Sequence, residues 1–560
     1  MRILFLTHSF NSLAQRLHVE LAARGHEVSV ELDIADTVSI EAARLYRPDL
    51  VFAPFLKRAI PEALWREHVC LVVHPGPPGD RGASSLDWAI LEGEPHWGVT
   101  VLQANAVMDG GDIWATRVFP MRAATKSSVY RNEVTEAACA AVLEAVEKFS
   151  HRGIPIRQNG GRFRPAMPQE MRRIDWEHDD TATVLAKIRV SDGAPGVLDH
   201  INGRELYLFD AHEESTLRGT EPGAIIARRH EAILRATVDG AVWIGHVRRK
   251  EGFKLPATLA LAEWLAGVPE SDPGILPPKR TGTWQDIAYE EAGEVGTLHF
   301  EFYNGAMSSE QCLRLRDAFL AATRRPTRVI VLAGGRDFWS NGIHLNRIEA
   351  AASPADESWR NIEAMDELCR AILECGTQLT VAALSGNAGA GGVFLALAAD
   401  RVWARLGSVL NPHYKNMGNL YGSEYWTYSL PRRVGAERAR ALMQERLPIG
   451  APRAAQMGLI DACFGDRLAQ FALEVHGRAS ELVSEAASIL ETKRARREHD
   501  EIAKPLARYR AEELERMRLN FYGFDPSYHV ARHRFVHRVP HAWTPLHLAR
   551  HRRAAWRRSA

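Results

Sequence analysis

Two residues in the N-terminal part of the chain could together carry out acid–base chemistry. His74 ends the apolar run CLVVH, and Asp109 lies in the glycine-rich stretch MDGGDIWA at residues 108–115. A carboxylate beside a histidine orients the imidazole and stabilises its protonated form, which makes the pair a general acid and base. A histidine after a strand can also be a hydrogen-bonded turn residue, but the glycine-rich turn that carries Asp109 favours the acid–base interpretation.

A second region combines glycine-rich turns with polar groups. The segment ALSGNAGAGGVFLALAAD at residues 383–400 predicts a strand, a turn and an apolar helix, and its glycines would let a ligand reach free N–H groups at the start of the helix. A similar turn is expected in LAGGRDFWSNGIHL at residues 332–345, and Tyr414 and Glu424 are the polar groups of the following NPHYKNMGNLYGSEYW. The alternatives are a simple strand-to-helix turn, a tyrosine that caps the core and a solvated loop glutamate.

The elements around His74 predict an open α/β sheet. The apolar segments MRILFLT, EVSVEL, DLVFAPFL and CLVVH read as strands, and the amphipathic SLAQRLHVELAARGH predicts a helix that Gly25 ends. Strands that alternate with helices form a parallel sheet, and ligands bind at the carboxyl ends of such strands. The first loop lacks G-x-G-x-x-G, so a nicotinamide site is not expected there.

Length and local composition divide the chain into several domains. A chain of 560 residues is too long for a single core. Short β-like runs broken by glycine and asparagine indicate a small barrel-like domain, and GVPESDPGILPPKRTGT indicates a linker. We therefore expect an α/β multidomain protein with a parallel-sheet domain at 1–165, a barrel-like domain at 171–262, a linker at 263–285, a second α/β domain at 286–480 and a helical, basic region at 481–560.

Composition excludes several classes of partner. With 70 Lys and Arg against 69 Asp and Glu, the formal charge of +1 provides no field for nucleic acid or an anionic membrane. The six cysteines show no C-x-x-C spacing, so neither a metal site nor a disulfide framework is expected. No apolar run is long enough for a signal peptide or a membrane span, which predicts a cytoplasmic protein. The basic end RHRRAAWRRSA predicts a solvated tail, with binding of a phosphorylated ligand as the less favoured alternative.

The first half of the chain resembles folate-dependent formyltransferases. HPGPPGDRGASSLDWAI and GVTVLQANAVMDGGDIWA look like the two signature segments of that family, and IDWEHDDTATVLAKIRV with INGRELYLFDA resembles its C-terminal barrel domain. The resemblance covers about residues 1–262 and implies a formyltetrahydrofolate site. Its expected catalytic residues are His74 and Asp109, and its expected ligand-binding residues are Arg81, Gly82, Ser84 and Ser85.

One position departs from the formyltransferase pattern. The family places an asparagine two residues before the histidine, where it helps to hold the oxyanion of the tetrahedral intermediate, but this chain has Val72. Loss of one oxyanion donor typically costs about 2.7–4 kcal/mol, and a valine donates no hydrogen bond. His74 and backbone N–H groups must then stabilise the intermediate, or the acceptor is easier to formylate than an amine, as a thiolate is.

Residues 286–480 resemble the crotonase (enoyl-CoA hydratase/isomerase) superfamily. The resemblance implies a coenzyme A thioester site in which Asn341 and Gly391 provide the N–H groups of the oxyanion hole and Gly389 and Gly392 complete the turn. The two glutamates of hydratases are replaced here by Phe394 and Tyr414. Because phenylalanine can neither take nor give a proton, we expect altered chemistry rather than addition of water, with Tyr414 and Glu424 as catalytic groups.

The fusion of these two halves, together with GDRGASSLDWAI and YGFDPSYHVARH, resembles the HoxX-type maturation proteins of nickel–iron hydrogenases. That resemblance implies transfer of formyl from formyltetrahydrofolate to coenzyme A, decarbonylation of formyl-CoA to carbon monoxide and CoA, and a link to the hydrogenase maturation machinery. One alternative is a formyltetrahydrofolate hydrolase with a CoA-sensing crotonase-like domain. A scaffold that only delivers a formyl carrier is less favoured, because it would not need His74 and Asp109.

Overall fold

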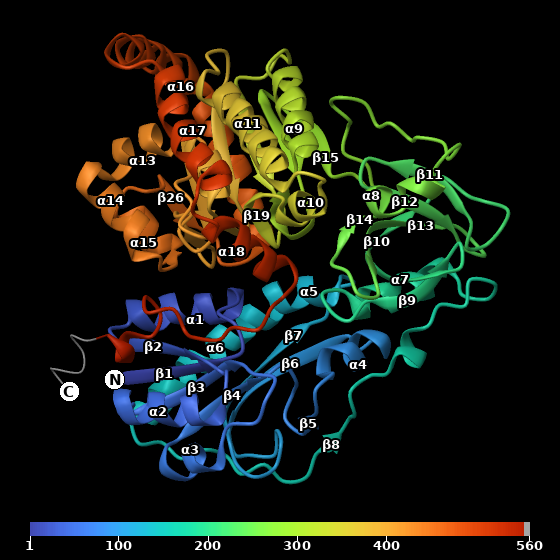
Figure 1. Cartoon of the computed structure of the whole chain (residues 1–560), viewed down its shortest axis with the longest axis vertical. Coiled ribbons are helices and arrows are strands. Elements are labelled where there is room, and N and C mark those ends of the chain that lie inside the picture. Colours follow the sequence, from blue (N-terminus) through green and yellow to red (C-terminus); the bar gives the residue numbers. More distant parts are fainter. Residues whose placement is uncertain (554–560) are drawn as a thin grey trace. The chain divides into compact units, whose positions relative to one another are not determined.

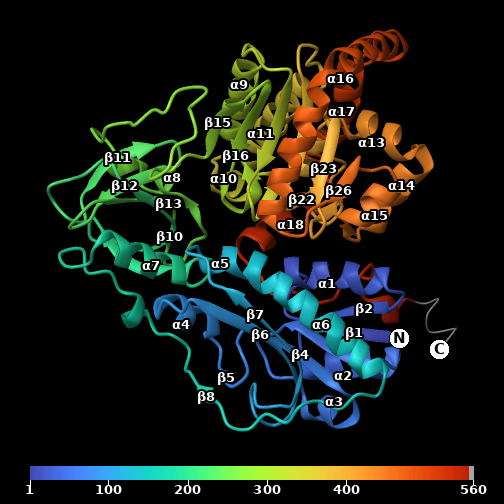
Figure 2. The same ribbon diagram turned by 180° about the vertical axis from the view of Figure 1, so that it is seen from behind.

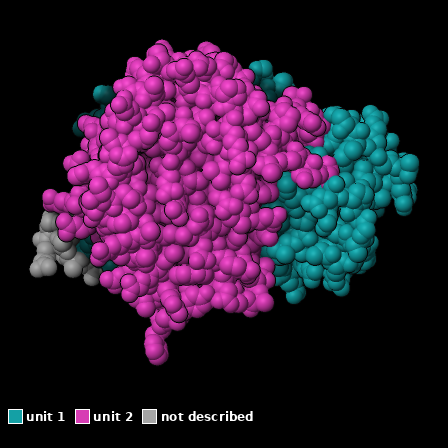
Figure 3. Space-filling view, turned by 90° about the horizontal axis from the view of Figure 1, so that it is seen from above, with its two compact units in different colours: residues 1–270, 540–560 teal, residues 271–539 magenta. Residues whose placement is uncertain are grey.

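The computed structural model describes residues 1–553, which form two compact units (Figure 3). The first unit contains Met1–Glu270 and the chain from Pro540 onward, and the second contains Ser271–Val539. The second unit is therefore inserted into the first. Within the described residues, no helix combines the length and hydropathy needed to cross a membrane.

The N-terminal sheet of the first unit positions His74. Its strand order is β2-β1-β3-β4-β6-β7, from β1 (Arg2–Thr7), β2 (Glu27–Leu32), β3 (Leu50–Phe55), β4 (Cys70–His74), β6 (His96–Gln103) and β7 (Ile113–Pro120). The four strands β1–β4 are parallel, as the sequence predicts. Strand β6 pairs antiparallel with β4 on one side and with β7 on the other. The helices α1 (Ser12–Ala23) and α6 (Thr135–Ser150) cover one face, and α2 (Asp36–Tyr46) and α3 (Glu62–Glu67) cover the other (Figure 1, Figure 2).

A second, antiparallel sheet follows in the same unit. It has the order β11-β12-β13-β10-β9, with the short β14 (Leu255–Pro256) also paired to β13. The strands are β9 (Val197–Ile201), β10 (Arg204–Glu214), β11 (Ile225–Arg229), β12 (Ala232–Ala236) and β13 (Ala241–Arg249). Helix α7 (Thr181–Ser191) packs its apolar side, including Val184 and Ile188, into the core of this sheet.

The C-terminal segment of the chain returns to the first unit. The Val30 N–H of β2 donates to the carbonyl of Leu548 at 3.1 Å, and the fully buried His551 contacts Glu31 of the same strand through Nε2 at 2.9 Å. Arg552 also pairs with Glu31 at 2.7 Å. The expectation of a solvated basic tail is therefore wrong for His551 and Arg552, because the buried carboxylate of Glu31 binds them, whereas Arg550 is exposed as expected. Residues 554–560 of that segment lie outside the described chain.

The second unit contains a six-stranded sheet in sequence order. Its strands are β15 (Ile287–Ala292), β16 (Val295–Phe300), β18 (Val329–Gly334), β21 (Leu379–Leu384), β23 (Arg401–Arg405) and β26 (Ala462–Phe464), parallel except for the β15–β16 pair. One face packs against α16 (Leu468–Ala503), and the other packs against α9 (Ser309–Ala322) and α11 (Pro354–Leu373).

A smaller sheet of the second unit carries the glycine-rich turns. After β18, β21 and β23, the chain enters β19 (Phe338–Ser340), β22 (Asn387–Gly389) and β24 (Val409–Asn411), which pair with one another and with β25 (Ile449–Gly450). Helix α12 (Gly391–Leu397) follows β22, and every residue of this helix is buried. The predicted strand, glycine turn and apolar helix at residues 383–400 are thus present.

Candidate active sites

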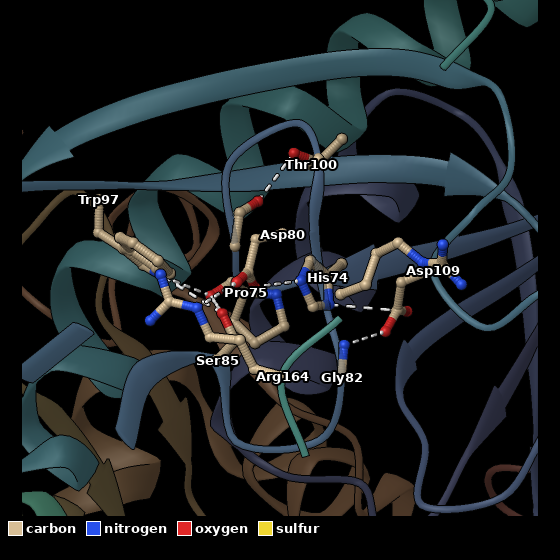
Figure 4. Close-up of polar contacts among 12 residues, drawn as sticks. His74, Pro75, Asp80, Gly82, Ser85, Trp97, Thr100, Asp109 and Arg164 are labelled. Atoms are coloured by element: carbon tan, nitrogen blue, oxygen red, sulfur yellow. Dashed lines mark hydrogen bonds and ion pairs between the residues drawn. The ribbon is translucent and has the colours of Figure 1, made fainter. Parts of the chain in front are cut away.

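The imidazole of His74 lies between two carboxylates (Figure 4). His74 is the last residue of β4 and is 4% exposed. Its Nε2 lies 2.9 Å from Oδ2 of Asp80, which begins the short strand β5 (Asp80–Arg81), and its Nδ1 lies 3.6 Å from Oδ1 of Asp109. The first distance is a hydrogen bond and the second is too long for one.

Asp80 therefore has the orienting role that the sequence assigns to Asp109. An ionised carboxylate only accepts, so the bond to Asp80 places the imidazole proton on Nε2 and leaves the Nδ1 lone pair facing Asp109. Burial works to raise the pKa of Asp80, but the hydrogen bond from His74 and the nearby charge of Arg164 hold that pKa below its ordinary value. Asp80 is ionised at neutral pH and fixes the tautomer that makes Nδ1 the base.

A glycine makes the contact between His74 and Asp80 possible. A Cβ on Gly76 would collide with both His74 Nε2 and Asp80 Oδ2. The Gly76 carbonyl is held by the Thr100 hydroxyl at 2.8 Å, which fixes the loop between the two residues. The Pro/Gly-rich sequence after His74 thus bends the chain so that Asp80 returns to the imidazole.

Asp109 occupies a strained turn on the opposite side of His74. Its backbone lies in the left-handed region, with φ +51°, and its Oδ2 accepts from the Gly82 N–H at 3.1 Å. Arg81 donates through Nε to the carbonyl of Met108 at 3.0 Å. Left-handed backbone at a non-glycine residue persists only where its surroundings hold it, so Arg81 and Gly82 keep Oδ1 of Asp109 aimed at Nδ1.

The two predicted serines support the loop that follows His74. The Ser84 hydroxyl accepts from the Met167 N–H at 3.0 Å, and the Ser85 hydroxyl donates to the Pro75 carbonyl at 2.7 Å, to which Trp97 Nε1 also donates. Val72 packs against the apolar core cluster of the sheet and provides no donor. The folate-binding roles of Arg81, Gly82, Ser84 and Ser85 remain predictions.

For the formyl transfer that the resemblance implies, we expect Asp80→Asn to slow the reaction by about tenfold to a hundredfold, by analogy with carboxylates that orient metal-bound histidines. The asparagine amide can turn its NH₂ group toward Nε2, which would move the imidazole proton to Nδ1 and remove the base. The measurement is the rate of tetrahydrofolate release. Asp112→Asn, at an exposed position three residues after Asp109, is the matched control, and equal rates for both variants would contradict the role of Asp80.

The second unit brings Tyr414, Glu424, Phe394 and Gly391 together. The Tyr414 hydroxyl bonds to Oε2 of Glu424, and its ring stacks on Phe394 with centroids 5.3 Å apart and planes 15° apart. A Cβ on Gly391 would collide with Oε1 of Glu424, so the carboxyl group lies against the first residue of α12. The first-turn amides of a helix have no acceptor within the helix, and the Gly391 amide is therefore suited to hold a thioester oxygen.

Burial sets the protonation of this second site. Glu424 is 2% exposed, and its burial raises its pKa to about 7, although hydrogen bonds from Tyr414 and Ser423 work in the opposite direction. Burial and the neighbouring Glu424 carboxylate raise the pKa of Tyr414 well above its ordinary value. Glu424 can therefore take up or release a proton near neutral pH, while Tyr414 stays protonated as a hydrogen-bond donor.

The structure does not support the predicted oxyanion role of Asn341. Its backbone N–H donates to the Gly305 carbonyl at 2.7 Å, and its side chain donates to the Asn304 carbonyl at 2.8 Å. Both groups are thus used inside the fold. Gly389 ends β22 and Gly392 lies in the first turn of α12, where a Cβ would collide with the Ser340 carbonyl.

Comparisons with known proteins assign a family to each part of the chain. Residues 31–146 match the formyl transferase family, residues 166–265 match the formyl transferase C-terminal domain, and residues 297–544 match the enoyl-CoA hydratase/isomerase family. A methionyl-tRNA formyltransferase from Halalkalibacterium halodurans is 26% identical over 40% of this chain and 72% of its own length.

One relative matches both halves at once. Hydrogenase maturation factor HoxX from Bradyrhizobium diazoefficiens is 56% identical, over 99% of this chain and 97% of its own length. This chain belongs to the HoxX/HypX family of hydrogenase maturation factors. HypX from Aquifex aeolicus, solved in complex with tetrahydrofolic acid, is 52% identical and superposes with a TM-score of 0.96 over 99% of each chain. The predicted family and α/β multidomain fold are confirmed.

Sequence reasoning missed three buried acids in this HoxX/HypX chain. Asp80 contacts His74, and Asp366 and Glu513 accept hydrogen bonds from the backbone of the turn that carries Glu424. For Asp366 the sequence does contain a signal, because Asp366 shares the buried helical face of Ile362 and Cys369 on α11. A carboxylate on an apolar face needs a polar partner.

Proposed function

We propose that this HoxX/HypX-family protein transfers the formyl group of formyltetrahydrofolate to coenzyme A and then splits formyl-CoA into carbon monoxide and CoA. The carbon monoxide would pass to the hydrogenase maturation machinery as a ligand for the hydrogenase iron. The observation that carries the proposal is the presence of two different acid–base sites, His74 between two carboxylates and the buried Tyr414–Glu424 pair beside Phe394. Tetrahydrofolate in the relative from Aquifex aeolicus supports a folate carrier as formyl donor.

In the first step, sulfur attacks the formyl carbon and the folate nitrogen leaves. Nδ1 of His74 takes the thiol proton and returns it to the leaving nitrogen, so the transfer is balanced without another reactant. Asp80 and Asp109 flank the imidazole and stabilise its protonated form between the two transfers. With Val72 in place of an oxyanion donor, the reaction depends on the nucleophilicity of a thiolate.

In the second step, Glu424 removes the formyl hydrogen as a proton, and the electron pair of that C–H bond becomes the carbon lone pair of carbon monoxide. The C–S bond breaks, its electrons go to sulfur, and the sulfur is protonated by Tyr414 or by the newly protonated Glu424. No oxidant, reductant or water is consumed. The buried, apolar Phe394 helps to exclude the water that would otherwise give formate.

The experiment that tests the transferase assignment measures tetrahydrofolate release from formyltetrahydrofolate with and without coenzyme A. We expect release to require CoA, because the thiol is the formyl acceptor. Isothermal titration calorimetry should show CoA binding to the intact protein. Release at the same rate without CoA would instead indicate a hydrolase.

A further inference from the structure

Two buried carboxylates from different helices hold the turn that carries Glu424. Asp366 lies on α11 and Glu513 lies on α17 (Leu506–Tyr522), and each is 0% exposed. The Glu424 N–H donates to Oδ1 of Asp366 at 2.7 Å. The Asp366 contact spans 58 positions of the sequence and the Glu513 contact spans 88, so both form only in the folded unit.

Glu513 uses both of its carboxylate oxygens. Oε2 accepts from the Tyr425 N–H at 2.9 Å, and Oε1 accepts from the Thr427 N–H at 2.8 Å. Helix α13 (Trp426–Val434) begins directly after Tyr425, whose own side chain makes no capping bond. Glu513 therefore caps α13 from another helix, because its two oxygens accept from the backbone N–H groups at the start of that helix.

The turn needs this support because its backbone is strained. Glu424 and Tyr425 are consecutive non-glycine residues in the left-handed region, with φ +60° and φ +56°. Such residues persist only where the surroundings over-determine them, and they cluster at functional sites. Without the acceptors on α11 and α17, the backbone of Glu424 would relax to an ordinary conformation and its carboxyl would leave Gly391 and Tyr414.

We propose that Asp366 and Glu513 are positioning residues for the decarbonylation step, which hold the Glu424 carboxyl against Gly391 and the Tyr414 hydroxyl. This inference rests on the proposed function of Glu424. A displacement of about 1 Å in a reacting group can lower a rate by about 10²-fold. The two acids touch no substrate in this account and act only through the geometry of Glu424.

Substitutions of the two acids can distinguish the effect of a hydrogen-bond acceptor from the effect of a negative charge. Asp366 uses one oxygen for the turn, while its Oδ2 makes no hydrogen bond and lies 3.4 Å from Arg510 Nε. Asparagine keeps the acceptor that Glu424 needs, whereas alanine removes it. Glutamine at position 513 keeps only one acceptor and turns an NH₂ donor toward a backbone N–H.

The test supplies formyl-CoA to the intact protein and measures kcat for carbon monoxide release and the Kd for CoA. We expect Asp366→Asn to stay close to wild type, and Asp366→Ala and Glu513→Gln to lower kcat by about 10²-fold with CoA affinity unchanged. The matched control is Asp400→Asn in the same unit, because the partly buried Asp400 accepts from the Thr380 N–H at 2.9 Å and pairs with Lys493. It should lower stability without changing kcat.

Two results would overturn the inference while leaving the proposed function intact. One is wild-type kcat in folded Asp366→Ala and Glu513→Gln. The other is an Asp366→Asn variant as slow as Asp366→Ala, which would mean that charge rather than position matters. If Glu513→Gln does not fold, the comparison of Asp366→Asn with Asp366→Ala tests the inference by itself. Failure of the wild-type protein to release carbon monoxide from formyl-CoA would instead refute the proposed function and the inference with it.

Discussion

Glu424→Gln is expected to reduce carbon monoxide release from formyl-CoA by about 10² to 10⁴-fold, the usual contribution of a general acid or base. Glutamine keeps the size of the side chain and can still accept the Tyr414 hydroxyl, but it cannot take the formyl proton. The measurement is trapping of carbon monoxide by reduced haemoglobin. Formyl transfer from the folate should continue at its wild-type rate, because His74 carries that step.

The same site should give a defined pH profile. The pKa of Glu424 is about 7 and the base must be ionised, so carbon monoxide release should rise as the pH increases through about 7. The hydrogen bond from Tyr414 lowers the pKa of Glu424, and Tyr414→Phe should therefore move the midpoint to higher pH as well as slow the reaction by about 10² to 10⁴-fold. Wild-type yields from both Glu424→Gln and Tyr414→Phe would place the chemistry elsewhere.

His74→Ala is expected to abolish formyl transfer, since it removes the only group that the proposed first step uses to move a proton between sulfur and nitrogen. Asp109→Asn should also lower the rate of formyl transfer, because Oδ1 of Asp109 faces Nδ1 of His74 and stabilises the protonated imidazole. The assay is consumption of formyltetrahydrofolate in the presence of CoA.

Two controls bear on this prediction. Circular dichroism should show that both variants keep their fold. Val72→Asn should be tolerated or faster, because it restores a donor for the oxyanion. Wild-type consumption of formyltetrahydrofolate by His74→Ala would contradict the assignment of the first site.

Local sequence patterns were enough to predict strands β1–β4 and the glycine turn before α12. Apolar runs such as CLVVH and the glycines near Gly391 have short-range causes, namely side-chain burial and close approach of the backbone. The antiparallel pairing of β4 with β6 was not predicted, because the amino-acid composition of a strand does not determine with which other strand it pairs.

The side-chain partners of the sites depend on contacts that sequence spacing does not encode. Asp80 lies in a Pro/Gly-rich loop where an aspartate is usually a turn residue, and only the bend at Gly76 returns it to His74. The N–H of Asn341 is taken by a carbonyl 36 residues away, which no local pattern indicates.

The sequence contains one signal that part of the C-terminal segment packs against β2, although the basic composition of that segment predicts solvent exposure. Glu31 lies in EVSVEL, a strand buried on almost every residue, and a buried carboxylate requires cationic or hydrogen-bonding partners. His551, Arg552 and Thr544 are those partners. The basic character of RHRRAAWRRSA predicts solvent exposure, whereas the charge of Glu31 determines where His551 and Arg552 bind.

The most direct test of the proposed two-step reaction follows the formyl carbon. Formyltetrahydrofolate with an isotopically labelled formyl group is incubated with the intact protein and CoA, and labelled carbon monoxide and labelled formate are quantified together with tetrahydrofolate. We expect labelled carbon monoxide in an amount equal to tetrahydrofolate, with CoA regenerated. Labelled formate as the product, with no carbon monoxide, would contradict it.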